Sequence, residues 1–146
     1  MGCVESSEVV FDRFLGVWYD LGGINTVSYT YSRLTLTQSG SLVFEEYDSR
    51  QILRGAYSGT VVALGQDKVQ MTVSMPKGEH TTRYNILYVD YDSFALIESE
   101  DGEIARLLTR SPLLHIRLLP SIRKQAERVG WNYDLMEVHS NLIDRS

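Results

Sequence analysis

The sequence predicts an all-β fold, an eight-stranded antiparallel up-and-down β-barrel with one C-terminal α-helix and a short final strand. Apolar and polar residues alternate with period two in short runs, and turn residues separate these runs at nearly even spacing. Near the C-terminus the apolar residues change to a helical period. A meander of eight strands leaves no unpaired edge when the sheet closes on itself, which favours a barrel over an open sheet.

The alternation predicts the position of each strand. We place the strands at Val17–Ile24, Val27–Leu36, Ser41–Asp48, Leu53–Leu64, Lys68–Met75, Thr81–Val89, Phe94–Glu98 and Ile104–Thr109. Turns with glycine or proline lie between several of them, at Ser39-Gly40, Gly65-Gln66-Asp67, Pro76-Lys77-Gly78 and Asp101-Gly102. Further on, Ile122, Ala126 and Val129 have the i, i+4, i+7 spacing of a helix. We therefore expect a helix over Pro120–Val129, ended by Gly130, and a last strand over Leu135–Val138.

Length and charge limit the possible functions. The 146 residues are enough for one domain, which we place at 9–146 after a flexible N-terminal segment at 1–8. The net charge is -5 and the 14 basic residues are scattered, so we expect no nucleic-acid partner. No apolar run approaches the ~20 residues of a membrane helix, so we expect a soluble domain apart from any lipid anchor. The single cysteine favours a reducing compartment, and we therefore expect this domain in the cytoplasm.

The sequence contains no recognisable catalytic or metal-binding motif. The three histidines, at positions 80, 115 and 139, lack the spacing of metal ligands, and no nucleotide-binding or serine-hydrolase pattern is present. Glu45 and Glu46 are consecutive, so on a strand they point to opposite faces and do not form an acid–base pair. We expect no enzymatic activity, no cofactor and no metal.

The interior of the predicted barrel offers a ligand site. On Lys68–Met75 the apolar face consists of Val69, Met71, Val73 and Met75, and the matching face of the next strand consists of Tyr84, Ile86 and Tyr88. Tyr29 and Tyr31 are expected neighbours, although a slip of one residue would invert any of these faces. Methionine adapts to irregular acyl chains, and tyrosine offers an apolar wall with a polar tip. The predicted ligand-binding residues are Tyr29, Tyr31, Met71, Val73, Met75, Tyr84, Ile86 and Tyr88. The alternative is a barrel filled by its own side chains.

Three ordered motifs carry a resemblance to a known family. The first is Phe11–Leu21, with Gly16 and Trp18; the second is Tyr84–Ile97, with Asp90 and Tyr91; the third is Ile104–Pro112, with Arg110. In this order they resemble the lipocalins, and the resemblance covers essentially the whole chain. It implies that Trp18 closes one end of the barrel and that Arg110 stacks on it, a cation–π contact of about 0.5–2 kcal/mol. Gly16 permits a close backbone bend, and Asp90 and Asp92 are expected to bond turn amides.

The tail adds a finer resemblance. A helix, then Gly130–Asp134, then a short apolar strand is similar to bacterial outer-membrane lipocalins, plant temperature-induced lipocalins and apolipoprotein D. The resemblance implies a monomer or weak dimer that transports or stores a small hydrophobic ligand such as a fatty acid or lysolipid. The alternatives are a lipocalin-type isomerase or synthase and a membrane-attached interaction module with a filled barrel. Unlike the family's long lid loop, the first connection here, Gly22–Val27, is compact.

The first six residues suggest a lipid anchor. Met1-Gly2-Cys3-Val4-Glu5-Ser6 matches the N-myristoylation pattern, with Cys3 placed for palmitoylation. Two acyl chains, on Gly2 and Cys3, would anchor the protein stably at a membrane surface, whereas one chain binds marginally. A second interpretation is a bacterial lipoprotein lipidated on Cys3, and a third is a chance match. Cys3 is the only cysteine, so no internal disulfide is possible.

Overall fold

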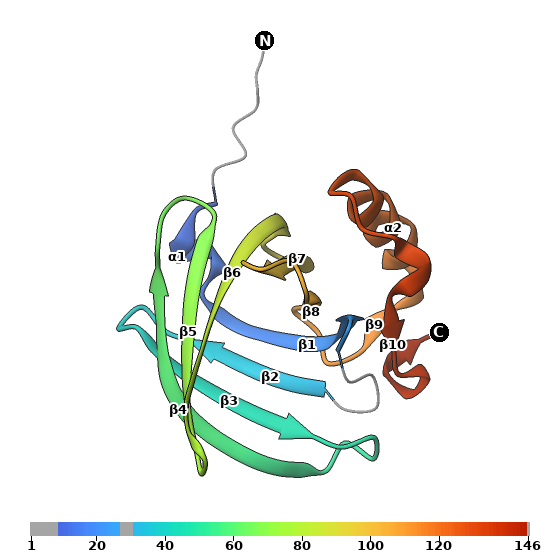
Figure 1. Ribbon diagram of the computed structural model, residues 1–146. Coiled ribbons are helices and arrows are strands. Elements are labelled where there is room, and N and C mark those ends of the chain that lie inside the picture. Colours follow the sequence, from blue (N-terminus) through green and yellow to red (C-terminus); the bar gives the residue numbers. More distant parts are fainter. Residues whose placement is uncertain (1–8, 27–30, 146) are drawn as a thin grey trace.

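A closed β-barrel forms the body of the molecule (Figure 1). The computed structural model describes residues 9–26 and 31–145. A one-turn helix, α1 (Phe11–Phe14), precedes the first strand. The barrel strands are β1 (Gly16–Ile24), β2 (Tyr31–Leu36), β3 (Ser41–Tyr47), β4 (Leu53–Ala63), β5 (Lys68–Met75), β6 (Gly78–Asp90), β7 (Phe94–Ser99) and β8 (Ala105–Thr109). Each pairs antiparallel with the next, and β1 pairs with β8 to close the sheet.

The C-terminal segment lies against the outside of the barrel (Figure 1). It comprises β9 (Leu114–His115), helix α2 (Leu119–Arg128), β10 (Glu137–Val138) and β11 (Ile143–Asp144), with 3-10 turns at Ile116–Leu118, Tyr133–Leu135 and Ser140–Leu142. β10 adds to β1 beyond the stretch that pairs with β2, through Gly22 and Gly23. β9 and β11 form a short parallel pair.

The predicted fold class is confirmed, and element boundaries differ by a few residues. The helix begins one residue earlier than expected and ends at Arg128. β6 starts at Gly78, three residues earlier than expected, because its pairing with β5 continues to the tight turn at Pro76-Lys77. The last strand shortens to Glu137–Val138, since the preceding residues form a 3-10 turn. The first part of the strand expected at Val27–Leu36, up to Thr30, lies outside the described residues.

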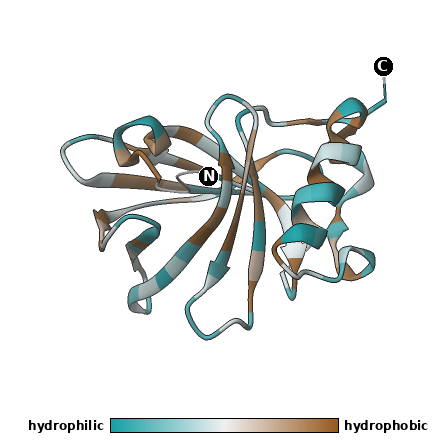
Figure 2. Ribbon diagram, turned by 90° about the horizontal axis from the view of Figure 1, so that it is seen from above, coloured by the Kyte–Doolittle hydropathy of each residue, from teal (hydrophilic) through white to brown (hydrophobic). Residues whose placement is uncertain are grey.

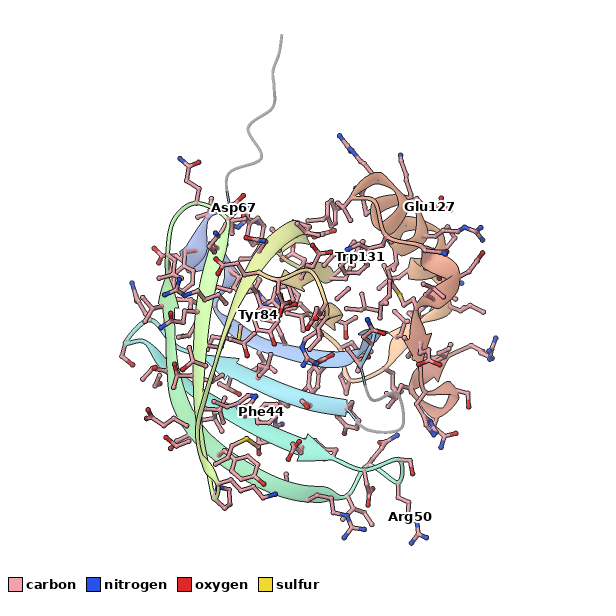
Figure 3. All side chains as sticks on the ribbon, in the orientation of Figure 1. Phe44, Arg50, Asp67, Tyr84, Glu127 and Trp131 are labelled. Carbon is pink, nitrogen blue, oxygen red and sulfur yellow. The ribbon has the colours of Figure 1, made fainter. Side chains whose placement is uncertain are left out.

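Two apolar cores lie on opposite faces of the sheet. The inner core fills one end of the barrel and includes Trp18, Leu36, Leu42 and Ile97. The outer core lies between the barrel and the C-terminal segment, where Leu96 and Leu107 pack with Ile122, Ala126 and Trp131. Figure 3 shows Trp131 between the barrel and α2. β7 is therefore buried on both faces, whereas apolar and polar residues alternate along the strands away from α2 (Figure 2).

Candidate functional site

Trp18 closes one end of the barrel. Its side chain is fully buried, and its indole Nε1 donates a 2.7 Å hydrogen bond to the carbonyl oxygen of Phe14 in α1. The Phe14 ring packs beside it, with ring centroids 5.4 Å apart. A buried indole N–H needs an acceptor, and the one-turn helix before β1 supplies it. This end of the barrel is therefore sealed by apolar contacts and one satisfied polar group.

Arg110 covers Trp18, as the resemblance implies. Its guanidinium carbon lies 3.6 Å from the centroid of the Trp18 ring. The guanidinium also donates to four carbonyl oxygens, of Tyr91 (2.8 Å), Val17 (2.8 Å), Arg13 (3.0 Å) and Leu15 (3.0 Å). Burial lowers the pKa of Arg110, and the nearby Asp92 carboxylate partly opposes that shift. Arg110 thus joins α1, β1 and the β6–β7 turn at the closed end.

Two further motif residues also have structural roles at this end. The Tyr91 hydroxyl accepts a 2.8 Å hydrogen bond from the Val10 amide, and the Asp90 carboxylate accepts one of 3.1 Å from the Asp92 amide. Gly16 has φ +103°, a region that side chains disfavour, but a Cβ there would only reach ordinary contact with Arg110. Backbone conformation, and not the close approach expected from the sequence, is therefore the reason for glycine at position 16.

Next to this closed end, inside the barrel, lies a cavity of about 670 Å³. Its apolar wall comes from β2, β3, β5, β7 and the residue before β8, and it consists of Leu34, Leu42, Phe44, Met71, Val73, Met75, Ile97 and Ile104. Figure 3 shows Phe44 and Tyr84 within the outline of the barrel. Of the predicted ligand-binding residues, Tyr31, Met71, Val73, Met75 and Tyr84 line the cavity.

The other predicted ligand-binding residues lie elsewhere. Ile86 is buried in the inner core, but it is not among the residues that line the cavity. Tyr88 belongs to the outer core, where its ring lies 5.2 Å from that of Phe94. The cause is a bulge in β6 between Ile86 and Tyr88, which adds one residue and reverses the face of those that follow.

Tyr31 lines the cavity as predicted, but its ring lies on the other face of β2 from the one expected. On β2 the inward positions are Ser32 and Leu34, so Tyr31 points to the outer face, where its ring stacks on Tyr47 at 4.8 Å. The register of this strand is one residue away from the predicted one. Tyr29, Gly2 and Cys3 lie outside the described residues.

A buried ion pair lies on one wall of the cavity. Arg106 Nη1 donates to Asp20 Oδ2 at 2.7 Å, and Arg106 Nε donates to the Tyr84 hydroxyl at 3.0 Å. The Asp20 and Arg106 side chains are 11% and 28% exposed. Burial raises the pKa of Asp20 above its usual range, although Arg106 and the Gly22 amide favour its charged form. Burial alone would lower the pKa of Arg106, but Asp20 and Tyr84 more than offset it and raise that pKa.

Other polar groups lie around the same cavity. Asn25, Thr26, Ser32, Glu46, His80 and Thr82 complete its lining. Within residues 9–26 and 31–145, the Glu46 carboxylate has no ion-pair partner, in contrast to Glu45, which pairs with Arg33 at 2.7 Å on the outer face. The expectation that Glu45 and Glu46 point to opposite faces is therefore confirmed.

Sequence reasoning missed most of this polar wall. Asp20 and Arg106 are 86 positions apart, and no local pattern links an acidic and a basic residue at that separation. Period-two alternation does identify Leu34 with Leu36 and Leu42 with Phe44 as inward pairs, and these apolar residues could have been found.

The described residues contain neither a metal-binding cluster nor a membrane helix. No group of three or more His, Cys, Asp or Glu side chains among them is arranged to hold a metal ion. No helix in this part of the chain is long and apolar enough to cross a membrane.

Comparison with solved structures identifies the fold. The chain matches insecticyanin from the tobacco hornworm Manduca sexta with a TM-score of 0.68 and 14% identity, over 99% of this chain and 87% of that one. It matches the allergen Per a 4 from cockroaches with a TM-score of 0.64 and 15% identity, over 94% and 93%. For lobster apocrustacyanin A1 the TM-score is 0.61 at 13% identity, over 92% and 79%.

These matches show that the chain has the lipocalin fold. No protein-family model matches the sequence, and no curated protein matches it either. At identities of 13–15%, structural similarity establishes the architecture alone.

Proposed function

We propose that this protein binds a small hydrophobic molecule inside the barrel and transports or stores it. The observation that supports this proposal is the cavity of about 670 Å³, whose wall is largely apolar and lies above a sealed end. Ligand sites in proteins have volumes of roughly 300–1,000 Å³ and predominantly apolar walls with a few polar groups. The cavity volume also disfavours an interaction module with a barrel filled by its own side chains.

An acyl chain suits the apolar part of this cavity. Each buried methylene contributes about 0.8 kcal/mol to binding, and Met71 and Met75 adapt to a flexible chain. Fatty acids and lysolipids both carry such a chain. They are therefore the ligand classes from which we start.

A carrier is favoured over an enzyme. The lipocalin route to prostaglandin synthesis, the synthase that the resemblance suggests, needs a cysteine inside the barrel, and the only cysteine is Cys3, which precedes the first strand in the sequence. Among the described residues, His80 makes no hydrogen bond to a serine or a carboxylate, so it is not paired as the base of a nucleophile.

Two substitutions at neighbouring positions test the cavity. Val73→Trp places an indole in the cavity, whereas Ser74→Trp places the same group on the exposed outer face of β5. We expect Val73→Trp to weaken binding of the neutral fluorescent probe N-phenyl-1-naphthylamine at least about tenfold, because the ring occupies the ligand volume. Ser74→Trp should bind like the wild type. Equal affinities in two folded variants would place the probe outside the barrel and contradict the proposal.

We also propose that the protein is attached to a membrane through Gly2 and Cys3. Support comes from the motif Met1-Gly2-Cys3-Val4-Glu5-Ser6, which matches the N-myristoylation pattern and places Cys3 next to Gly2. In native cells we expect the wild type to fractionate with membranes, Cys3→Ser to bind them weakly and Gly2→Ala to be soluble. Loss on Cys3→Ser with retention on Gly2→Ala would indicate a bacterial lipoprotein. A soluble, unmodified wild type would exclude both forms of attachment.

A closer relationship to bacterial outer-membrane lipocalins, plant temperature-induced lipocalins and apolipoprotein D is a further part of the proposal. It is supported by the order of α2, the Gly130–Asp134 segment and β10 in the tail.

A further inference from the structure

One wall of the cavity carries hydrogen-bond donors for which the described part of the chain supplies no acceptor. Arg106 Nε donates to the Tyr84 hydroxyl and Nη1 to Asp20, while Nη2 donates to no atom of the described residues. The Tyr84 hydroxyl accepts the bond from Nε, so its own O–H is left to donate. Both Arg106 and Tyr84 line the cavity. The polar end of a ligand that meets this wall must therefore bring lone pairs.

The charge of the cavity restricts the acceptor further. The charge of Arg106 is already balanced by Asp20 at 2.7 Å. Among the aspartate, glutamate, lysine and arginine residues of the described lining, Glu46 is the one that remains, so these residues together carry one uncompensated negative charge. Residues 27–30 carry no charged side chain in the sequence. An anionic head at Arg106 would lie beside the Asp20 carboxylate, which repels it in a setting of low dielectric.

We propose that this wall selects a hydrophobic ligand whose polar end is an uncharged oxygen acceptor, such as the carbonyl of an ester, ketone or amide, and discriminates against free carboxylates. The inference rests on the proposed carrier function and narrows its ligand class, because, of the two acyl-chain classes named above, it disfavours free fatty acids. The Tyr84 O–H and Arg106 Nη2 donate to the acceptor, and Asp20 excludes a negative charge. An ammonium group brings no lone pair to these donors, so it does not satisfy the wall.

Three ligands with the same chain test this selection. Dodecanoate, methyl dodecanoate and dodecylamine compete with N-phenyl-1-naphthylamine for the protein near pH 7.5, where their heads are an anion, a neutral ester and a cation. We expect the ester to displace the probe from the wild type at a concentration at least about tenfold lower than dodecanoate needs. Equal displacement by ester and carboxylate, or strongest displacement by the amine, would overturn the proposal.

Asp20→Asn separates charge from hydrophobicity. The amide keeps an oxygen for Arg106 Nη1 but removes the negative charge, so the guanidinium becomes available to an anion. We expect the affinity for dodecanoate to rise about tenfold in this variant, while the affinity for the ester changes little. Glu46 is more exposed than Asp20, so Glu46→Gln should raise the affinity for dodecanoate by a smaller factor. This variant replaces Asp20→Asn in the test if Asp20→Asn does not fold. Unchanged dodecanoate affinity in whichever variant folds would contradict the charge argument.

Tyr84→Phe tests the hydroxyl donor against a matched control. We expect Tyr84→Phe to lower the affinity for the ester several-fold. Tyr133→Phe removes a hydroxyl from the C-terminal segment outside the barrel and should leave that affinity unchanged. No loss of ester affinity in Tyr84→Phe would overturn the role of the hydroxyl. If the probe does not bind the folded wild type, the proposed carrier function is wrong. If the probe binds but the three head groups compete equally, only the proposed preference for an uncharged oxygen acceptor is wrong.

Discussion

The contact between Trp18 and Arg110 is the feature whose energy follows most directly from the structure. Trp18 is fully buried, so Trp18→Ala should cost about 3–5 kcal/mol of unfolding free energy through the cavity it leaves. Arg110→Ala removes bonds to four carbonyls, two of them exposed and two part-buried. The exposed bonds are largely replaced by water, so we expect a loss of about 2 kcal/mol.

The two losses should not add. With the guanidinium 3.6 Å from the indole centroid, the stacking itself is worth about 1 kcal/mol. The double variant should therefore lose about 1 kcal/mol less than the sum of the single losses. Urea unfolding followed by far-ultraviolet circular dichroism measures all four proteins without relying on tryptophan emission, which the substitution alters. If Trp18→Ala leaves too little folded protein, Trp18→Leu completes the same cycle. Losses that add within about 0.3 kcal/mol would refute the stacking energy.

Four further results are expected. Met71→Asp should abolish probe binding while Gln70→Asp, on the outer face, retains it, measured by fluorescence titration. Tyr88→Ala should lower the melting temperature without changing probe affinity, because its ring packs in the outer core; a loss of affinity would contradict that placement. Gly23→Ala should cost more than about 2 kcal/mol, since a Cβ would collide with the Ala105 carbonyl; a smaller loss in urea unfolding would show that β8 can shift. Asp48→Asn should reduce the loss of stability that the wild type shows below about pH 4. The Ile52 amide, the Arg50 amide and Arg54 lower the pKa of Asp48 in the folded protein. The stabilisation by the ionised carboxylate is therefore present above the pKa of the unfolded state and is lost as the pH falls through the pKa of the folded state. Urea unfolding at several pH values measures this, and an unchanged fall in unfolding free energy at low pH in Asp48→Asn would contradict the role of Asp48.

The strands were predictable because their cause is local, and the closed end was predictable because its residues resemble those of the lipocalins. Alternation along Lys68–Met75 identifies the strand with its bounds and its inward face, since side chains on a strand alternate with period two. The contact between Trp18 and Arg110 was implied by the resemblance to the lipocalins, and the structure contains it at 3.6 Å. Asp90 was likewise predictable, because its carboxylate bonds an amide two residues away.

Bulges and register were not predictable from local pattern. The bulge after Ile86 turns Tyr88 out of the barrel, and a different register on β2 turns Tyr31 toward Tyr47. Neither event changes the composition or periodicity of the strand enough to be read in sequence. The inward faces of β2 and β6 therefore depend on pairing with neighbouring strands.

The sequence by itself determined the number and order of the eight barrel strands and the helix of the tail, and its resemblance to the lipocalins identified Trp18 and Arg110 at the sealed end. Only the tertiary structure decided the chemistry of the cavity. Closing β1 onto β8 brings Asp20 to Arg106 across 86 positions and places Tyr84 beside them. Local sequence cannot specify such a cluster, because its members meet only when the sheet closes and its register is set.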